Sequence, residues 1–418
     1  MYLFTGRGVR LEPRKAASLS GPVEELPLCG RLAVPLYTLG KTKLELTAGM
    51  GGKVAKYAPL ALSRSRGHAI LAPVSGRVLG VELREHPLLG KVPCALLEPD
   101  EAVQPCRTSA PPLESFAAFV EAAKRAGITD EYDGRPLYRK LREWKESPPS
   151  LLLVNALDDD PYVSSGIVSL LEDGEAAVKG AKAITEALGG CEVKAAVFDS
   201  LERGRRSKLP RQIGDAEVLR VIGKYPVLPV LRERLGGRVE AVGVQACAAL
   251  FRAVTEGQPQ TELVVTVAGD AVAAWKNLRV PVGTPVGYLL ERCGLDENLR
   301  WLVGGGTMDG ESIPDLQTPL VAGMRCLLAL KSRPWAKRFS CIGCGRCMLA
   351  CPRHLMPYYI AKLKEQKEFA EAMNYGAGEC IHCGACTAAC PSGIELTAII
   401  RAVVKRNQRA EWSDEDDG

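Results

Sequence analysis

The sequence lacks any long apolar run, and it has no large excess of charge of either sign. No hydrophobic stretch approaches the roughly 18 to 20 residues that a membrane-spanning helix needs, and the first fifteen residues carry charges where a signal peptide has its apolar segment. The 54 basic and 49 acidic residues leave a formal net charge of only +5 over 418 residues. These absences argue against membrane insertion, secretion and nucleic-acid binding. We expect a cytoplasmic protein that reaches the inner face of the cell membrane only through a partner protein.

Length and composition indicate a globular protein of several domains. A chain of 418 residues exceeds one ordinary hydrophobic core, and 46% hydrophobic with 25% charged residues excludes disordered and collagen-like classes. Short stretches of alternating type with many glycines predict an all-β module over residues 1–105. Helical spacing that alternates with apolar runs such as 151–154 and 195–198 predicts an α/β layer with a parallel sheet over residues 106–260.

The carboxyl-terminal part divides into smaller units. Strand-like and helical stretches predict a compact unit over residues 261–330, in which the glycines at 304–306 mark a turn, since they lack the strand-then-helix setting of a phosphate loop. A basic linker, 331–337, opens a cysteine-rich unit that runs to residue 410. The acidic end, 411–418, is predicted to be a disordered tail.

Cysteine is abundant and unevenly placed. Of the fifteen cysteines, eight lie between residues 341 and 390. The other seven are scattered, and an odd number without a secretory signal makes a poor disulfide framework. We predict that these seven are buried core thiols: Cys29, Cys94, Cys106, Cys191, Cys247, Cys293 and Cys326.

Two cysteine runs share one spacing. Residues 341–352 read CIGCGRCMLACP and residues 380–391 read CIHCGACTAACP. This is the bacterial ferredoxin pattern, in which three closely spaced thiolates bind one 4Fe-4S cluster and the fourth, before proline, ligates the other cluster. We therefore predict two 4Fe-4S clusters. The ligands of the first are Cys341, Cys344, Cys347 and Cys390, and those of the second are Cys380, Cys383, Cys386 and Cys351.

A pair of zinc sites is the alternative for these cysteines. Structural zinc motifs usually consist of two well-separated CxxC pairs, not four cysteines within eleven positions that end before proline. The repeated spacing favours iron and sulfide. His354 and His382 lie close to the predicted ligands and either tune the cluster potentials by hydrogen bonding or are simply exposed.

Several stretches in order resemble the RnfC family of electron-transport complexes. Residues 72–76 (APVSG) are similar to the hairpin of biotinyl- and lipoyl-type barrel sandwiches, with Ser75 near the place of the modifiable lysine, so we expect a docking or structural role there. The likeness to RnfC rests on that hairpin, on the two cysteine runs, and on residues 4–9 (FTGRGV), 265–270 (VTVAGD) and 280–285 (VPVGTP). It implies a barrel-sandwich module, an α/β domain like the flavin subunit of complex I, an SLBB unit of β-grasp type and a helical dicluster domain.

The middle domain departs from the family pattern at its cofactor motifs. The family loop GxGGAGFPT, which holds FMN and NADH, is replaced by AGITDEYDGRPL over residues 126–137, and the motif NGAECEPY becomes NALDDDPY over residues 155–162. The QGGE motif and the polar flavin segment are also lost, at 227–230 and 245–250. Side chains and carboxylates there would block and repel a phosphate. We expect no FMN or NADH; if either binds, the candidate residues are Asn155, Asp158 and Asp160.

Three functions follow from this resemblance. The first is an RnfC-like electron carrier or oxidoreductase subunit, without catalytic residues of its own, that relays single electrons to Rnf-type membrane subunits or to a soluble reductase, for example an amino-acid reductase such as proline reductase. Without flavin, no group converts the two electrons of NADH into single ones. The second is an FMN-containing, NADH-oxidising subunit of an Rnf-type ion-translocating complex. The third is a non-redox assembly scaffold with structural clusters.

Overall fold

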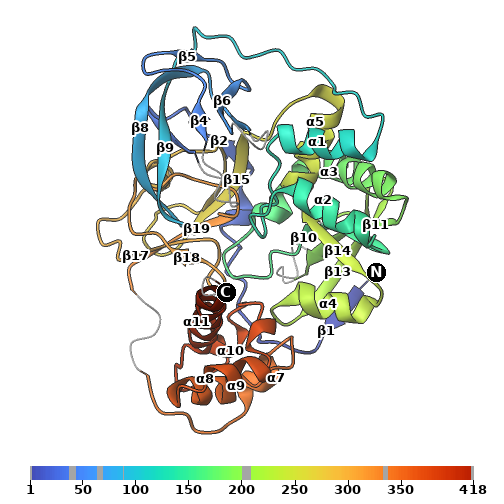
Figure 1. Ribbon diagram of the computed structural model, residues 1–418, viewed down its shortest axis with the longest axis vertical. Coiled ribbons are helices and arrows are strands. Elements are labelled where there is room, and N and C mark those ends of the chain that lie inside the picture. Colours follow the sequence, from blue (N-terminus) through green and yellow to red (C-terminus); the bar gives the residue numbers. More distant parts are fainter. Residues whose placement is uncertain are drawn as a thin grey trace.

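The computed structural model describes residues 2–36, 44–63, 69–87, 89–199, 209–332 and 338–415, with the backbone alone at residue 2 and at 408–415 (Figure 1). Most of the expected basic linker, residues 333–337, lies outside these ranges. Among the described helices, none combines the length and the apolar character needed to cross a membrane.

Two small antiparallel sheets pack face to face in the amino-terminal third of the chain. Leu60 of one sheet and Leu32, Val78 and Leu97 of the other share one core. At the hairpin that resembles carrier domains, the Ser75 hydroxyl accepts a hydrogen bond from the backbone N–H of Lys56 at 2.8 Å, which is a structural contact. The first sheet has the order β3 (Leu32–Pro35), β9 (Gly90–Pro99), β8 (Gly76–His86) and β5 (Lys53–Val54), and the second has the order β4 (Glu45–Leu46), β6 (Pro59–Leu62) and β7 (Ala69–Leu71).

A parallel sheet forms the centre of the next unit, as the buried apolar runs predict. Its central strand, β10, is buried along all six residues because helices cover both faces. The strand order is β1 (Tyr2–Thr5), β13 (Ala216–Gly223), β11 (Glu192–Phe198), β10 (Leu151–Ala156) and β14 (Val239–Gly243), and β12 (Gln212–Ile213) pairs antiparallel with β13.

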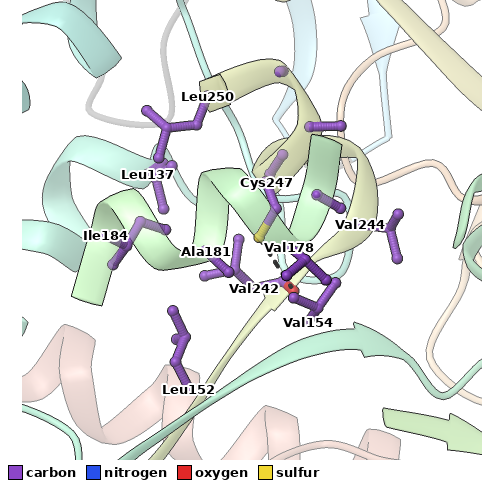
Figure 2. Close-up of a cluster of buried hydrophobic side chains, with 14 of the residues drawn as sticks. Leu137, Leu152, Val154, Val178, Ala181, Ile184, Val242, Val244, Cys247 and Leu250 are labelled. Atoms are coloured by element: carbon purple, nitrogen blue, oxygen red, sulfur yellow. Dashed lines mark hydrogen bonds between the residues drawn. The ribbon is translucent and has the colours of Figure 1, made fainter. Parts of the chain in front are cut away.

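The helices divide between the two faces of this sheet. Leu152 and Val154 of β10 point into a core with four helices, whereas Leu151 and Leu153 pack in the opposite core with α4 (Val227–Leu235). Figure 2 shows the larger core, in which Cys247 lies among Val178, Ala181 and Val242. Its helices are α1 (Phe116–Arg125), α2 (Leu137–Glu146), α3 (Ser165–Leu188) and α5 (Val244–Glu256).

A mixed sheet with one helix forms the third unit. The glycines at 305 and 306 lie in the turn between two of its strands, as expected from the sequence. The helix, α6 (Val286–Arg292), packs Leu289 and Leu290 against Val265 and Leu278 of the sheet. The strand order is β18 (Glu311–Ser312), β17 (Trp301–Gly304), β19 (Cys326–Leu330), β15 (Glu262–Ala268), β16 (Lys276–Pro281) and β2 (Val23–Glu25).

The amino-terminal thirty residues connect these units instead of joining the β module. Strand β1 is the edge of the parallel sheet beside β13, and β2 is the edge of the mixed sheet beside β16. A short 3-10 helix, η1 (Ser18–Ser20), lies between them. All of residues 1–105 are expected from the sequence to form one module, but the strands that pair within that module begin at Leu32. Strands of three or four residues contain no signal for a distant partner.

Short helices form the carboxyl-terminal domain, at the bottom of Figure 1. Ile360, Leu363, Ile400 and Val403 are at its core. The last helix continues to Glu415, so the predicted disordered tail is helical over 411–415, where alanine and glutamate favour a helix. The elements are α7 (Arg346–Ala350), α8 (Pro357–Glu365), α9 (Phe369–Asn374), η3 (Ala377–Glu379), α10 (Ala385–Ala388) and α11 (Leu396–Glu415).

The scattered cysteines follow the prediction with two exceptions. Five of the seven are buried, among them Cys247 in the core of Figure 2. Cys106 is exposed and Cys191 is half-buried, so the expectation that all seven are core thiols is wrong for these two. Cys106 lies in the irregular segment between β9 and α1, where no described element covers it.

The crossing of α3 and α5 makes a first prediction. Gly180 of α3 lies directly against the backbone of Cys247 in α5, where an added Cβ would overlap the carbonyl oxygen. Because a backbone atom cannot turn aside, we expect Gly180→Ala to destabilise the protein by about 1–3 kcal/mol, seen as a lower midpoint of thermal or chemical unfolding. Gly30→Ala is the control, since nothing lies within 4 Å of its added Cβ. Equal midpoints for the two variants would contradict the close contact.

Candidate metal centre and the adjoining crevice

The two cysteine runs fold in the same way. In each run, the first two cysteines are followed by glycine or histidine in left-handed backbone, and a short helix then begins, α7 in the first run and α10 in the second. Left-handed backbone turns the loop tightly and is tolerated best by glycine. The equivalent pairs are Gly343 and His382 (φ 68° and 54°), Gly345 and Gly384 (71° and 78°), and His354 and Gly393 (56° and 65°).

The ligands expected for the second cluster lie around one small cavity. Cys380, Cys383 and Cys386 come from the second run, and Cys351 comes from the first. Burial raises the pKa of Cys383 to about 12 and that of Cys386 to about 11, so both thiols are protonated at neutral pH until a metal displaces the proton. A cavity enclosed by four thiols from two chain segments suits the donor set of a 4Fe-4S cluster.

The ligands expected for the first cluster are more open. Cys341 and Cys344 are exposed, whereas Cys347 is buried and shares an apolar cluster with Cys390. The Cys341 sulfur accepts a hydrogen bond from the backbone N–H of Gly343 at 3.4 Å, the kind of contact that loop amides make to cluster ligands. Within the described ranges, no three His, Cys, Asp or Glu side chains converge as they would on a single metal ion.

The two histidines beside the ligands differ in their surroundings. His354 is exposed, with its Nε2 3.7 Å from the carboxylate of Glu233. His382 is half-buried, and its Nδ1 has no hydrogen-bond partner among the described residues. Burial lowers the pKa of His382, and the positive charges of Arg401 and Lys405 lower it further. His382 is therefore a neutral side chain at neutral pH.

The cavity of the second ligand set lies against the other domains. The Tyr225 hydroxyl donates to the carbonyl oxygen of Cys383 at 2.7 Å, and the backbone of Tyr225 exchanges two hydrogen bonds with Val9. Arg7 reaches the carbonyl oxygen of Cys351 at 3.5 Å. Two polypeptide segments from the α/β unit thus hold the loops that provide the second ligand set, while the first set stays at the surface.

Three consecutive aspartates follow β10 at the carboxyl edge of the parallel sheet. Each accepts hydrogen bonds from a different element: Asp158 from the N–H of Ile167 in α3 at 2.8 Å, Asp159 from that of Val227 in α4 at 2.6 Å, and Asp160 from that of Met308 at 2.9 Å. The Asp160 carboxylate also accepts the N–H and hydroxyl of residue 307. Nearby, Asn155 accepts the N–H of residue 157. All three residues that the sequence offers as flavin candidates have partners within the chain.

Two buried cations and a tyrosine occupy the same crevice. The Arg325 guanidinium lies 4.2 Å from the centre of the Tyr132 ring and 3.6 Å from the Asp158 carboxylate, to which the Tyr132 hydroxyl donates at 3.0 Å. The Lys15 ammonium donates to the backbone carbonyl of Asp158, and burial lowers the pKa of Lys15. Sequence reasoning missed Lys15 and Arg325, because neither stands in a motif and a lysine near a polar chain end normally lies at the surface.

An internal carboxylate caps the helix that follows β14. Glu131 accepts the backbone N–H groups of Gln245 and Ala246, at 2.8 and 3.1 Å, at the start of α5. An added Cβ at Gly243 would overlap this carboxylate. Free N–H groups at such a helix start are a common site for phosphate. In this chain, the side chain of the altered loop fills that position.

The buried Glu131 predicts a pH-dependent stability. Burial raises its pKa to about 8, above an unfolded value of about 4.3. The folded state then binds a proton more tightly than the unfolded state, so the contribution of Glu131 to stability falls as the pH rises from about 4 through 8. We expect Glu131→Gln to lose less thermal stability than the native protein between pH 5 and pH 8.

The measurement is the difference in melting temperature between variant and native protein at each pH. Glu25→Gln, at an exposed position of β2, is the control, and its difference should not change with pH. A difference for Glu131→Gln that falls with pH would mean that the two helix amides hold the carboxylate ionised.

Comparison with known proteins matches both ends of the chain. Residues 4–102 match the RnfC barrel sandwich hybrid domain, and residues 340–394 match the 4Fe-4S dicluster domain. These matches identify the amino-terminal sheets as a barrel sandwich and the carboxyl-terminal helices as a ferredoxin-type iron–sulfur domain. A chain of the NAD+-reducing [NiFe]-hydrogenase in its H2-reduced state aligns with a TM-score of 0.43 and 14% identity, over 70% of this chain and 61% of that one.

Curated relatives extend the likeness over most of the chain. The RnfC-type component of the ion-translocating oxidoreductase complex of Serratia proteamaculans (strain 568) is 28% identical over 396 residues, which are 88% of this chain and 56% of that protein. Its counterpart in the proton-translocating ferredoxin:NAD(+) oxidoreductase complex of Clostridium ljungdahlii is 27% identical over 391 residues, or 87% of this chain and 85% of that protein. The chain thus spans only about half the length of relatives such as the first. The two domain matches, with this likeness across the segment between them, make the chain a member of the RnfC family.

Proposed function

We propose that this protein relays single electrons through two 4Fe-4S clusters, from a reduced partner to a membrane complex or a soluble reductase. The observation that carries the proposal is the cavity lined by Cys351, Cys380, Cys383 and Cys386, because it combines ligands from both runs as the ferredoxin pattern requires. The family match supports redox partners of the kind found in ion-translocating complexes. An amino-acid reductase such as proline reductase is one soluble acceptor of this class.

The residues of the chain would divide the work between them. Each cluster, when bound, accepts and releases one electron at a potential set by charge, hydrogen bonds and exposure. The eight cysteines would hold the clusters. Tyr225 and Arg7, through the carbonyl groups of Cys383 and Cys351, would fix the loops of the second set against the α/β unit. Cys341 and Cys344 leave the first set accessible from the surface.

The middle unit is proposed to be a flavin-type fold that keeps its scaffold without the cofactor. Glu131 occupies the start of α5, and the aspartates after β10 bind elements of the chain itself. The Tyr132 ring and the Arg325 guanidinium fill the crevice between them. Under this proposal NADH is not the direct electron donor. We also propose that residues 261–330 form an SLBB domain, with the other boundaries as stated from the sequence.

A second candidate function is an FMN-containing, NADH-oxidising subunit of an Rnf-type complex. It is favoured by the Clostridium ljungdahlii relative, whose name includes NAD(+) and of which this chain covers 85%. In that case Asn155, Asp158 and Asp160 would contact the flavin. Each would have to give up the partner within the chain that it has in this structure.

Cofactor content separates the two functions. Protein purified and reconstituted without oxygen is expected to contain about eight irons and about eight sulfides per chain, for two 4Fe-4S clusters, and no flavin. NADH alone should leave the clusters oxidised, while dithionite should reduce them reversibly. A flavin absorbance band, or reduction by NADH, would establish the second function. Clusters that no reductant at physiological potential reduces would leave the third function, a structural scaffold.

Paired cysteine variants test the crossed ligation. Cys341→Ala with Cys390→Ala removes two ligands of the same cluster, so about four irons should remain, whereas Cys341→Ala with Cys351→Ala removes one ligand from each and should lose nearly all iron. Iron analysis and the electron paramagnetic resonance spectrum of the reduced protein measure both. Cys106→Ala, outside both runs, is the control. If the first pair loses all iron and the second keeps half, each run holds its own cluster.

A further inference from the structure

The surface around the first ligand set is strongly apolar. Phe339, Ile342 and Leu349 are 64%, 70% and 74% exposed, and all three lie in the segment that contains Cys341 and Cys344. Met348, on the helix α7 of the same segment, is also exposed. Large apolar side chains gathered in so short an exposed stretch mark a surface that another protein covers.

A groove of about 580 Å³ opens beside Cys341 on this surface. Phe339 lines one part of it, and α8 contributes Tyr358, Lys362 and Lys364. Tyr358 and Lys362 are both exposed and one helical turn apart, so an aromatic ring and an ammonium group are presented side by side. The groove therefore leads from a basic and aromatic helix face directly to a predicted cluster ligand.

The free charges at this surface are mainly positive. Arg346, Lys362 and Lys364 make no ion pair with any residue that the structure describes. Of the two acidic side chains that line the groove, Glu395 is paired with Arg338 at 2.5 Å, which leaves Glu365. An apolar centre with unpaired cations at its edge is complementary to a partner with acidic groups around an apolar contact.

We propose that this face is the docking site of a small acidic protein that carries one electron, such as a protein of the acidic ferredoxin class. The inference rests on the proposed function and adds the partner and its place of contact. One electron would leave the reduced centre of the carrier, which is oxidised, and reduce the cluster held at Cys341 and Cys344. No bond forms or breaks in this step, and no proton moves. Exposed ligands at the contact shorten the path between the two centres.

Binding of an acidic two-cluster bacterial ferredoxin to the oxidised, cluster-loaded protein tests the proposal. Biolayer interferometry should show an affinity that falls with added salt, and Lys362→Glu and Arg346→Glu should each weaken it about tenfold by placing like charges at the contact. Arg107→Glu is the matched control, because it makes the same change of charge at an exposed position between β9 and α1, outside the cluster domain. It should leave the affinity within about twofold of the native value.

The rate of electron transfer provides a second measurement. In stopped flow, reduced ferredoxin should reduce the native protein and Arg107→Glu at similar second-order rates, and Lys362→Glu at least several times more slowly. Dithionite should reduce all of them alike. Leu349→Ala should also slow transfer from ferredoxin without altering the effect of salt, since it removes apolar contact and no charge.

The outcomes distinguish this inference from the proposed function. Clusters that dithionite cannot reduce would refute the proposed function itself. Reducible clusters with ferredoxin binding that is equal in Lys362→Glu and Arg107→Glu would overturn only the docking site. Tighter binding of basic cytochrome c than of ferredoxin, or binding of anionic phosphatidylserine vesicles that Lys362→Glu abolishes while ferredoxin does not bind, would likewise overturn it and assign the face to a different partner.

Discussion

The satisfaction of buried carboxylates is the constraint on which the arrangement of the units depends. A carboxylate that leaves water must find donors inside the protein, or it loses several kcal/mol of hydration. The three aspartates after β10 find theirs in α3, in α4 and in the loop at 307–308 of the mixed sheet. One short segment thereby connects both faces of the parallel sheet with the next unit. Lys15, which comes from the amino-terminal segment, adds a fourth element to the same network.

That network also positions the iron–sulfur domain. Met308, which donates to Asp160, lies in the apolar cluster that includes Tyr225, Ala350 and Ala385. Ala350 and Ala385 belong to α7 and α10, the short helices that follow the cysteine loops. The second ligand set is therefore held against a rigid interior, whereas the loop at Cys341 and Cys344 meets solvent. Two cluster sites with the same local backbone thus acquire different surroundings from the domains beside them, and surroundings are what set a cluster potential.

How far the sequence predicts the structure depends on the distance over which each feature is encoded. The parallel sheet and the turn at 305–306 follow from local patterns, since apolar runs and glycines act on their own neighbours. The altered residues of the flavin motifs could be read as lost glycines and added carboxylates. Their new partners could not, because Glu131 and Asp160 find donors more than a hundred residues away. The edge positions of β1 and β2 depend in the same way on strands far along the chain.

A crevice filled by its own side chains explains how an altered cofactor fold can remain folded. Loss of a phosphate from a helix start leaves N–H groups without an acceptor, and a buried donor without a partner costs about 1–3 kcal/mol. Glu131 supplies the acceptor at α5, and the Tyr132 ring with the Arg325 guanidinium supplies a stacked, charged layer in the crevice. Such a unit has no further need of a ligand for stability. It can then serve as a fixed support, on which the enclosed ligand set is held and from which the exposed set is presented to a partner.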